Sequence, residues 1–185
     1  MIFRLFRRDP QAATFTALYG VIVAQARVPA FYMEFGVPDT PEGRFDLLVL
    51  HLALVCRRLG QAEGMDRDTA QALSQGVFDM FCRDMDHNLR EMGVSDLSVP
   101  KTMRKLGEAF YGRLDTYDRA LAQADDAELA AALARNTHGD GARLARYVRA
   151  VAARLAALPI ADLANARLSF PDPATLAAPA CEARA

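Results

Sequence analysis

Apolar residues recur three and four positions apart along most of this chain, in stretches that end at proline or glycine. One such stretch carries Phe45, Leu48, Val49, Leu52 and Cys56. Side chains at this spacing lie on one face of an α-helix, whereas a half-buried strand requires strict alternation. The chain has no alternating stretch, no glycine-rich phosphate-binding loop and no internal repeat. The pattern therefore predicts an all-α fold.

Residues that start and stop helices predict where the helices lie. Asp9 is a good N-cap before Pro10, and Gly93 suits the left-handed position after a helix. We expect a single-domain bundle of about six to eight helices over residues 10–168. A basic and apolar N-terminal segment precedes it at 1–9, and a Pro- and Ala-rich flexible tail follows at 169–185. The long helices should begin near residues 10, 41, 68, 98, 125 and 143, with shorter helical pieces near 30–36 and 161–170.

The loop VPDTPEGR at residues 37–44 predicts a helix start with a side-chain cap. We expect Asp39 to accept from the free amides of the next helix and Glu42 to fold back onto the Asp39 N–H, as in a capping box. Two prolines should stiffen this loop. The predicted structural motif comprises Asp39, Gly43, Arg44 and, at the end of the following helix, Gly93.

Composition excludes several classes of protein. With 185 residues, 52% of them hydrophobic and 24% charged, the chain can bury a sizeable core and is not disordered. A net charge of -1 gives no general attraction to DNA. The three cysteines show no CxxC spacing, and we recognise no secretory signal, so we expect a cytoplasmic protein. No apolar run approaches the roughly eighteen residues of a membrane-spanning helix.

The stretch DMDHNLREMGVSDL at 84–97 is the strongest candidate for chemistry. Asp84, His87 and Glu91 share one flank of the expected helix and could converge on a metal. Helical two-metal sites need a second carboxylate-x-x-His pair from a facing helix, and the chain has none. We therefore favour a solvated flank with i,i+4 ion pairs, Asp79 to Arg83 and Asp86 to Arg90. A metal-dependent helical enzyme that uses this flank remains the alternative.

Other reactive side chains lack a catalytic setting. Cys56 and Cys82 lie among apolar neighbours, where a small buried side chain is their usual role. His51 lies in an apolar run and is more often a hydrogen-bonded core residue than a ligand. No serine lies in a nucleophile-elbow sequence. We therefore predict no catalytic residue, no cofactor and no metal, and a protein that is not an enzyme.

Charge is distributed unevenly along the chain. Residues 66–96 contain seven acidic and three basic residues, whereas residues 101–119 contain five basic and three acidic ones. The last long helix and the segment MIFRLFRR at 1–8 carry arginines without an acid. Such surfaces are either solvated faces or contacts for anionic lipid, RNA or an acidic partner. The arginines on the last long helix are Arg143, Arg146, Arg149 and Arg154.

Three segments together resemble the ubiquinol-cytochrome c chaperone family, over about residues 15–170. They are VPDTPEGRFD at 37–46, DMDHNLREMGVSDL at 84–97 and EAFYGRLDTYDRAL at 108–121. The resemblance implies an all-helical assembly factor for respiratory complex III that holds newly made cytochrome b and hands it over. It implies no catalytic residues.

From the resemblance we expect the protein at the cytoplasmic face of the inner membrane, attached peripherally, with cytochrome b as its partner. The ribosome and the membrane surface are further candidate partners, and the oligomeric state stays open. A methionine-rich and aromatic surface can repack around varied helices, so we place the partner contact where the acidic helix meets the basic one. The residues predicted there are Met80, Phe81, Asp84, Met85, Arg90, Met92, Lys101, Met103, Arg104, Lys105, Phe110, Tyr111 and Arg113.

Overall fold

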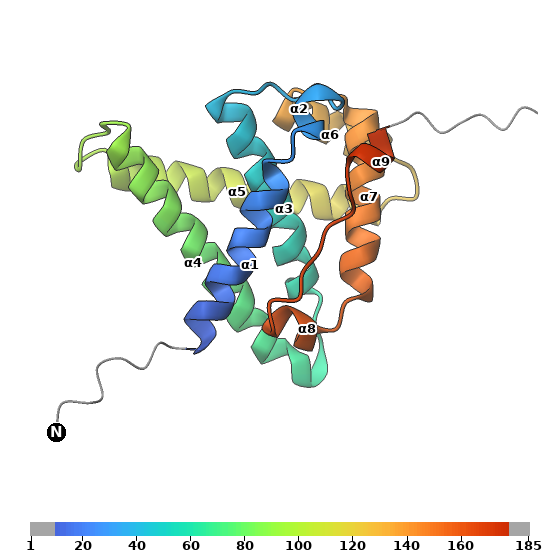
Figure 1. Cartoon of the computed structure of the whole chain (residues 1–185), viewed down its shortest axis with the longest axis horizontal. Coiled ribbons are helices and arrows are strands. Elements are labelled where there is room, and N and C mark those ends of the chain that lie inside the picture. The colour runs from blue at the N-terminus through green and yellow to red at the C-terminus, as the bar shows by residue number, and fades with distance from the viewer. Residues whose placement is uncertain (1–9, 178–185) are drawn as a thin grey trace, which may run out of the picture.

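The computed structural model describes residues 10–177, and this range is all-helical without a strand. The predicted N-cap Asp9, the segment 1–9 and residues 178–185 lie outside the described residues. One hydrophobic core joins the helices, as predicted for a single helical domain (Figure 1). In chain order they are α1 (Pro10–Ala26), α2 (Ala30–Met33), α3 (Pro41–Gly60), η1 (Gly64–Asp66), α4 (Arg67–Glu91), α5 (Val99–Ala122), α6 (Ala127–Thr137), α7 (Gly141–Ala157), α8 (Ile160–Ala164) and α9 (Ala174–Ala177).

Helix α3 lies at the centre of the bundle and contacts α1, α4, α5, α6 and α7 (Figure 1). Every residue from Asp46 to Cys56 is buried. The sequence predicted a stripe on one face, but the outer helices bury every face of the middle part of α3, residues 46–56. A helix that is apolar all round is stable in water only when it is enclosed in this way.

The start of α3 differs from the predicted capping box. The N-cap is Thr40, whose Oγ1 accepts from the Gly43 N–H at 3.1 Å. Asp39 instead pairs with Arg44, with 2.7 Å between Oδ1 and Nε. Aspartate and threonine both cap helices well, and Pro41 at the first helical position makes the residue directly before it the cap. The predicted helix start is confirmed, but the assignment of Asp39 as the cap was wrong by one residue.

Gly93 ends α4 in the left-handed conformation, with φ at 81°, as predicted. Its N–H donates to the Arg90 carbonyl, and the Val94 N–H donates to the Leu89 carbonyl, both at 3.0 Å. This Schellman arrangement satisfies the last carbonyls of the helix and reverses the chain. Helix α5 then packs back along α4, and the hairpin between them extends away from the other helices (Figure 1).

His51 is a fully buried, hydrogen-bonded core residue, as predicted. Its Nδ1 lies 2.7 Å from the Leu47 carbonyl and its Nε2 lies 2.8 Å from the Tyr147 hydroxyl. The Gln25 amide donates to that hydroxyl, and the Phe170 ring packs edge-on against the imidazole at 5.3 Å. A neutral imidazole satisfies both contacts by donating from Nδ1 and accepting at Nε2. Burial accordingly lowers the pKa of His51 to about 4.

Three of the four arginines predicted to form a basic face on α7 form hydrogen bonds with other parts of the chain. Arg149 forms an ion pair with Asp126 at 2.7 Å and donates to one carbonyl in the last turn of α5 and to two carbonyls that follow this helix. Arg143 donates to the Glu34 carbonyl at 2.6 Å. Arg154 donates to Ser169, which fastens the chain after α8 onto α7. Within residues 10–177 Arg146 has no such partner, so the free basic face is much smaller than predicted.

Residues 169–177, the first part of the predicted tail, lie against the domain. The Pro171 carbonyl accepts from Gln25 at 3.3 Å, and Ala177 is buried. Phe170 belongs to the aromatic cluster around His51. Apolar side chains therefore hold this part of the tail on the bundle.

Candidate functional site

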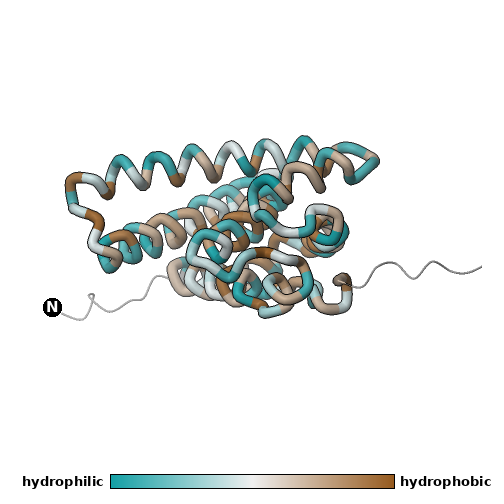
Figure 2. The backbone as a smooth tube through the Cα atoms, turned by 90° about the horizontal axis from the view of Figure 1, so that it is seen from above, coloured by the Kyte–Doolittle hydropathy of each residue, from teal (hydrophilic) through white to brown (hydrophobic). Residues whose placement is uncertain are grey.

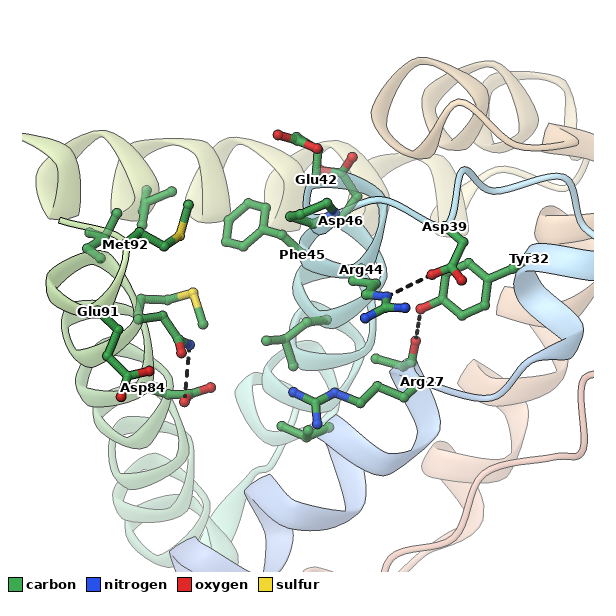
Figure 3. A pocket seen from close by; sticks show the side chains of 18 of the residues that line it. Arg27, Tyr32, Asp39, Glu42, Arg44, Phe45, Asp46, Asp84, Glu91 and Met92 are labelled. Carbon is green, nitrogen blue, oxygen red and sulfur yellow. Dashed lines mark hydrogen bonds and ion pairs between the residues drawn. The ribbon is translucent and has the colours of Figure 1, made fainter. Parts of the chain in front are cut away.

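A cleft of about 1250 Å³ separates the second half of α4 from α1, α2 and the start of α3 (Figure 3). Helix α5 contributes Leu106 and Arg113 to it. All three segments that resemble the chaperone family contribute to its lining, although they are far apart in the sequence. Their lining residues are Asp39, Pro41, Glu42, Arg44, Phe45, Asp46, Asp84, Met85, Asn88, Leu89, Glu91, Met92 and Arg113.

The wall formed by α1, α2 and the start of α3 carries two arginines over an apolar surface. Arg44 forms its ion pair with Asp39 here, and this pairing holds the pKa of the Asp39 carboxyl below its usual range. The Tyr32 hydroxyl donates to the Ala26 carbonyl at 2.9 Å and so ties α2 to the end of α1. Arg27 extends from α1 toward α4 (Figure 3). On this wall Arg44 is held by Asp39, whereas Arg27 has no ion pair within residues 10–177; Glu42 and Asp46 add acidic groups to the same wall.

The opposite wall is acidic and rich in methionine. Asp84 accepts from the Tyr19 hydroxyl at 2.7 Å and from the Asn88 amide at 3.3 Å, so its carboxylate is held in place. Burial and this carboxylate together raise the pKa of Tyr19, which keeps the phenol protonated and able to donate. Glu91 and Met92 lie at the outer end of the wall, and Met92 is 73% exposed.

A largely buried ion pair lines the cleft. Arg113 Nη1 lies 2.7 Å from Asp46 Oδ1, and their side chains are 19% and 10% exposed. This contact has the distance of an ion pair, but no hydrogen bond of good geometry reaches Arg113 Nη1 from residues 10–177. Burial raises the pKa of Asp46, and the guanidinium opposes that rise. Arg113 also lies over the Phe45 ring at 5.9 Å, so the pair joins the charged and apolar parts of the cleft.

The lining combines an apolar floor with charges of both signs, which suits binding better than catalysis. Within residues 10–177 no group of three His, Cys, Asp or Glu side chains is placed to hold a metal ion. In the predicted flank, Asp84 is held by Tyr19, whereas His87 Nε2 lies 3.1 Å from Glu91 on an exposed part of α4. The Asp86 to Arg90 ion pair is formed at 2.7 Å. The Asp79 to Arg83 pair is not formed, because Asp79 accepts from Gln75 instead.

Four of the predicted partner-binding residues line the cleft, namely Asp84, Met85, Met92 and Arg113. Phe81 and Phe110 are only 1% and 2% exposed, so a partner cannot reach them without opening the domain. Arg90 bridges Asp86 and Asp96. The remaining predicted residues lie outside the lining; they are the half-buried Met80 and Met103 and the exposed Lys101, Arg104, Lys105 and Tyr111.

Sequence reasoning missed the wall that faces α4. Arg27, Tyr32 and Met33 lie before the capping loop, in a stretch that predicted only a short turn of helix. Phe45 was interpreted as a core residue, although it is half-buried and lines the cleft. The available signal was position, because Tyr32 and Met33 lie shortly before VPDTPEGRFD, the first of the segments that carry the resemblance.

Comparisons with known proteins agree with the resemblance. Residues 33–170 match a family model described as Ubiquinol-cytochrome C chaperone. The ubiquinol-cytochrome-c reductase complex assembly factor 1 of Xenopus laevis is 27% identical over 119 residues, which are 64% of this chain and 57% of that protein. This chain thus spans less than two thirds of that relative. The crystal structure of the Cbp3 homolog from Brucella abortus superposes with a TM-score of 0.80 at 40% identity, covering 94% of this chain and 98% of that one.

Proposed function

This chain belongs to the ubiquinol-cytochrome C chaperone family, and from that premise we propose that it binds newly made cytochrome b and supports assembly of complex III. We propose further that it acts by binding and release, without a catalytic step. One observation carries the proposal: the three family-like segments, whose lining residues run from Asp39 to Arg113, meet in a single cleft.

The composition of the cleft favours an amphipathic client segment. Its apolar lining includes Val23, Phe45, Leu48, Leu89 and Leu106, which can receive apolar side chains. Methionine side chains at its edge adapt to different shapes because they are unbranched and flexible. A purely apolar segment would desolvate the charged lining residues without compensating them, which is costly. A client segment that also carries charges can pair with them.

The two walls would orient such a segment. Arg27 and Arg44 lie on one side of the cleft, whereas Asp84 and Glu91 lie on the other (Figure 3). Arg27 is the unpaired cation of its wall within residues 10–177, so a client helix with an acidic flank toward Arg27 and a basic flank toward Asp84 and Glu91 would be favoured in one direction. Charge pairs of this kind contribute more to specificity than to affinity.

The proposed place of action is the cytoplasmic face of the inner membrane, with peripheral attachment. None of the helices within residues 10–177 is long and apolar enough to cross a bilayer. The segment MIFRLFRR remains a candidate attachment site from its sequence, with alternating apolar and basic residues. The arginines of α7 are weak candidates, because three of them hold the fold together.

A deletion strain complemented with variants tests the proposal. Loss of the protein should deplete cytochrome b and ubiquinol oxidation and leave the other respiratory complexes largely intact. The double variant M33E/M92E places two carboxylates at exposed edges of the cleft, where both methionines are more than 70% exposed. It should fold normally and fail to restore cytochrome b.

Met65 supplies the matched control, because it is fully exposed and does not line the cleft. The variant M65E should restore cytochrome b as well as the unchanged protein does. A photoreactive residue at Met92 should also crosslink to cytochrome b in growing cells. Normal cytochrome b in the deletion strain would overturn the proposed function, and full rescue by M33E/M92E would remove the cleft from it.

A further inference from the structure

We propose that the turn between α4 and α5 is a membrane-contact element that binds the surface of an anionic bilayer. We call this element the α4–α5 tip and define it as residues 92–105. The inference does not depend on the identity of the client, because it concerns a different surface and a different ligand. It assigns Leu97 to the interfacial layer of the membrane and Lys101, Arg104 and Lys105 to the lipid phosphates.

Leu97 is held outward at the end of the α4–α5 hairpin. Its side chain is 95% exposed. The Ser98 N–H donates to the Ser95 carbonyl at 2.8 Å, and the two serine hydroxyls lie 3.0 Å apart, so a closed turn fixes the backbone on both sides of it. Figure 2 shows apolar segments at this end of the molecule, where α4 and α5 meet away from the other helices. The leucine therefore cannot fold back onto the core while the turn is intact.

The α4–α5 tip itself carries three basic residues, Lys101, Arg104 and Lys105, and one acidic residue, Asp96. Residues 90–105 contain four basic and two acidic residues, in a chain with a net charge of -1. Arg90 is shared between Asp86 and Asp96, and Glu91 lies 3.1 Å from His87. Lys101 and Lys105 have no ion pair with any residue in 10–177, and Arg104 has only a 3.8 Å contact with Glu108.

The three basic residues occupy the exposed face of α5, opposite the face that packs against the bundle. Lys101, Arg104 and Lys105 are all exposed, whereas Val99 and Phe110 are buried. Peripheral proteins bind anionic membranes through exposed apolar residues that lie next to Lys and Arg. Each basic residue near such a membrane surface contributes about 1 kcal/mol to binding. The fixed apolar apex is the feature that favours lipid over nucleic acid, since base recognition uses aromatic stacking or groups that hydrogen-bond.

The position of the tip gives the contact a geometric consequence. Met92 belongs both to the tip and to the lining of the cleft. A protein seated on the bilayer through Leu97 would therefore hold one end of the cleft beside the membrane surface. A segment of a membrane protein could enter the cleft there without crossing open water.

The absence of tryptophan from the chain allows a site-specific test with the full-length protein. In the variant L97W the single indole reports on the apex of the tip. Its emission should shift to shorter wavelength with vesicles that contain phosphatidylglycerol, and brominated lipids should quench it. Neutral phosphatidylcholine vesicles should have a much smaller effect. Adding K101E/K105E should weaken partitioning at least about tenfold, as expected from the loss of two favourable lysines alone.

The variant M65W is the matched control, since Met65 is fully exposed at the other end of α4 beside Asp66 and Asp68. Its indole should stay unquenched, and all variants should keep the unfolding midpoint of the unchanged protein to within a few degrees. An unquenched indole in L97W while the protein still co-sediments with vesicles would place membrane binding elsewhere and overturn the proposal. It would equally be overturned if K101E/K105E bound like its parent, or if RNA, but not vesicles, changed the emission of L97W.

Discussion

Replacing Gly43 by alanine should destabilise the domain, although the same replacement normally stabilises a helix. Gly43 is the third residue of α3, and a Cβ there would lie 2.0 Å from the Pro38 carbonyl oxygen and 3.1 Å from its carbon. Side-chain carbons do not approach backbone oxygen so closely, so α3 or the capping loop must move by about 1 Å. Either movement displaces backbone, and it disturbs the hydrogen bond from the Gly43 N–H to Thr40 Oγ1 that caps α3.

The expected cost follows from three contributions. Overpacking of this kind costs roughly 1–3 kcal/mol, and a disturbed cap costs about 1 kcal/mol more. Alanine has a higher helix propensity than glycine, and this difference offsets up to about 1 kcal/mol of the loss. The net loss should be about 1–3 kcal/mol, which lowers the melting temperature of a chain of this size by roughly 2–12 °C.

The assay is thermal and urea unfolding of G43A followed by far-ultraviolet circular dichroism. Gly112 is the matched control, because it lies in the middle of α5 with nothing within 4 Å of an added Cβ. The variant G112A should therefore be slightly more stable than the unchanged protein. If G43A proved as stable as G112A, the close packing of the capping loop on α3 would be refuted.

Three further outcomes are expected. Thr40→Ala should lower the free energy of unfolding by about 1 kcal/mol, because it removes the cap. Asp39→Ala should lower it by less, because an exposed ion pair contributes little. A larger loss for Asp39→Ala than for Thr40→Ala in urea unfolding would identify Asp39 as the cap. Arg149→Ala should cost about 2 kcal/mol through its lost charged hydrogen bonds, whereas Arg146→Ala should stay within about 0.5 kcal/mol in the same assay. Since burial lowers the pKa of His51 from 6.5 to about 4, the unfolded chain binds the extra proton between these values. Stability should fall as pH falls from 6.5 to 4, and urea midpoints across that range should fall less steeply for His51→Gln.

The helices could be predicted because their signals are local. Gly93 ends α4 through its own backbone conformation, and Pro41 marks the first turn of α3. The cap before Pro41 was assigned one residue too early because Asp39 and Thr40 both have suitable side chains, and only the observed hydrogen bonds distinguish them. His51 was interpreted correctly because its neighbours in the sequence are apolar and therefore buried with it.

The cleft could not be predicted from periodicity, because it depends on how helices pack. Phe81 and Phe45 are both aromatic residues on apolar faces, yet Phe81 is buried and Phe45 lines the cleft. Likewise Arg149 and Arg146 lie on the same helix, but of the two only Arg149 forms hydrogen bonds with residues 123–126 after α5. Which residues face the opening is decided by helices that are distant in the sequence. The resemblance located three of the contributing segments but not the spatial relation between them.

The burial of α3 on every side has a consequence for how this protein is made. Its apolar surface emerges from the ribosome early, but the partners that enclose it include α7 and Phe170, which are synthesised about a hundred residues later. Until then the nascent chain itself exposes the kind of surface that it is proposed to shield in its client. A ribosome-bound chain that ends before Phe170 should be cut rapidly by protease within α3, whereas the released full-length chain should resist. The protein could then bind a client only after its own synthesis is complete, when α7 and Phe170 cover the apolar surface of α3.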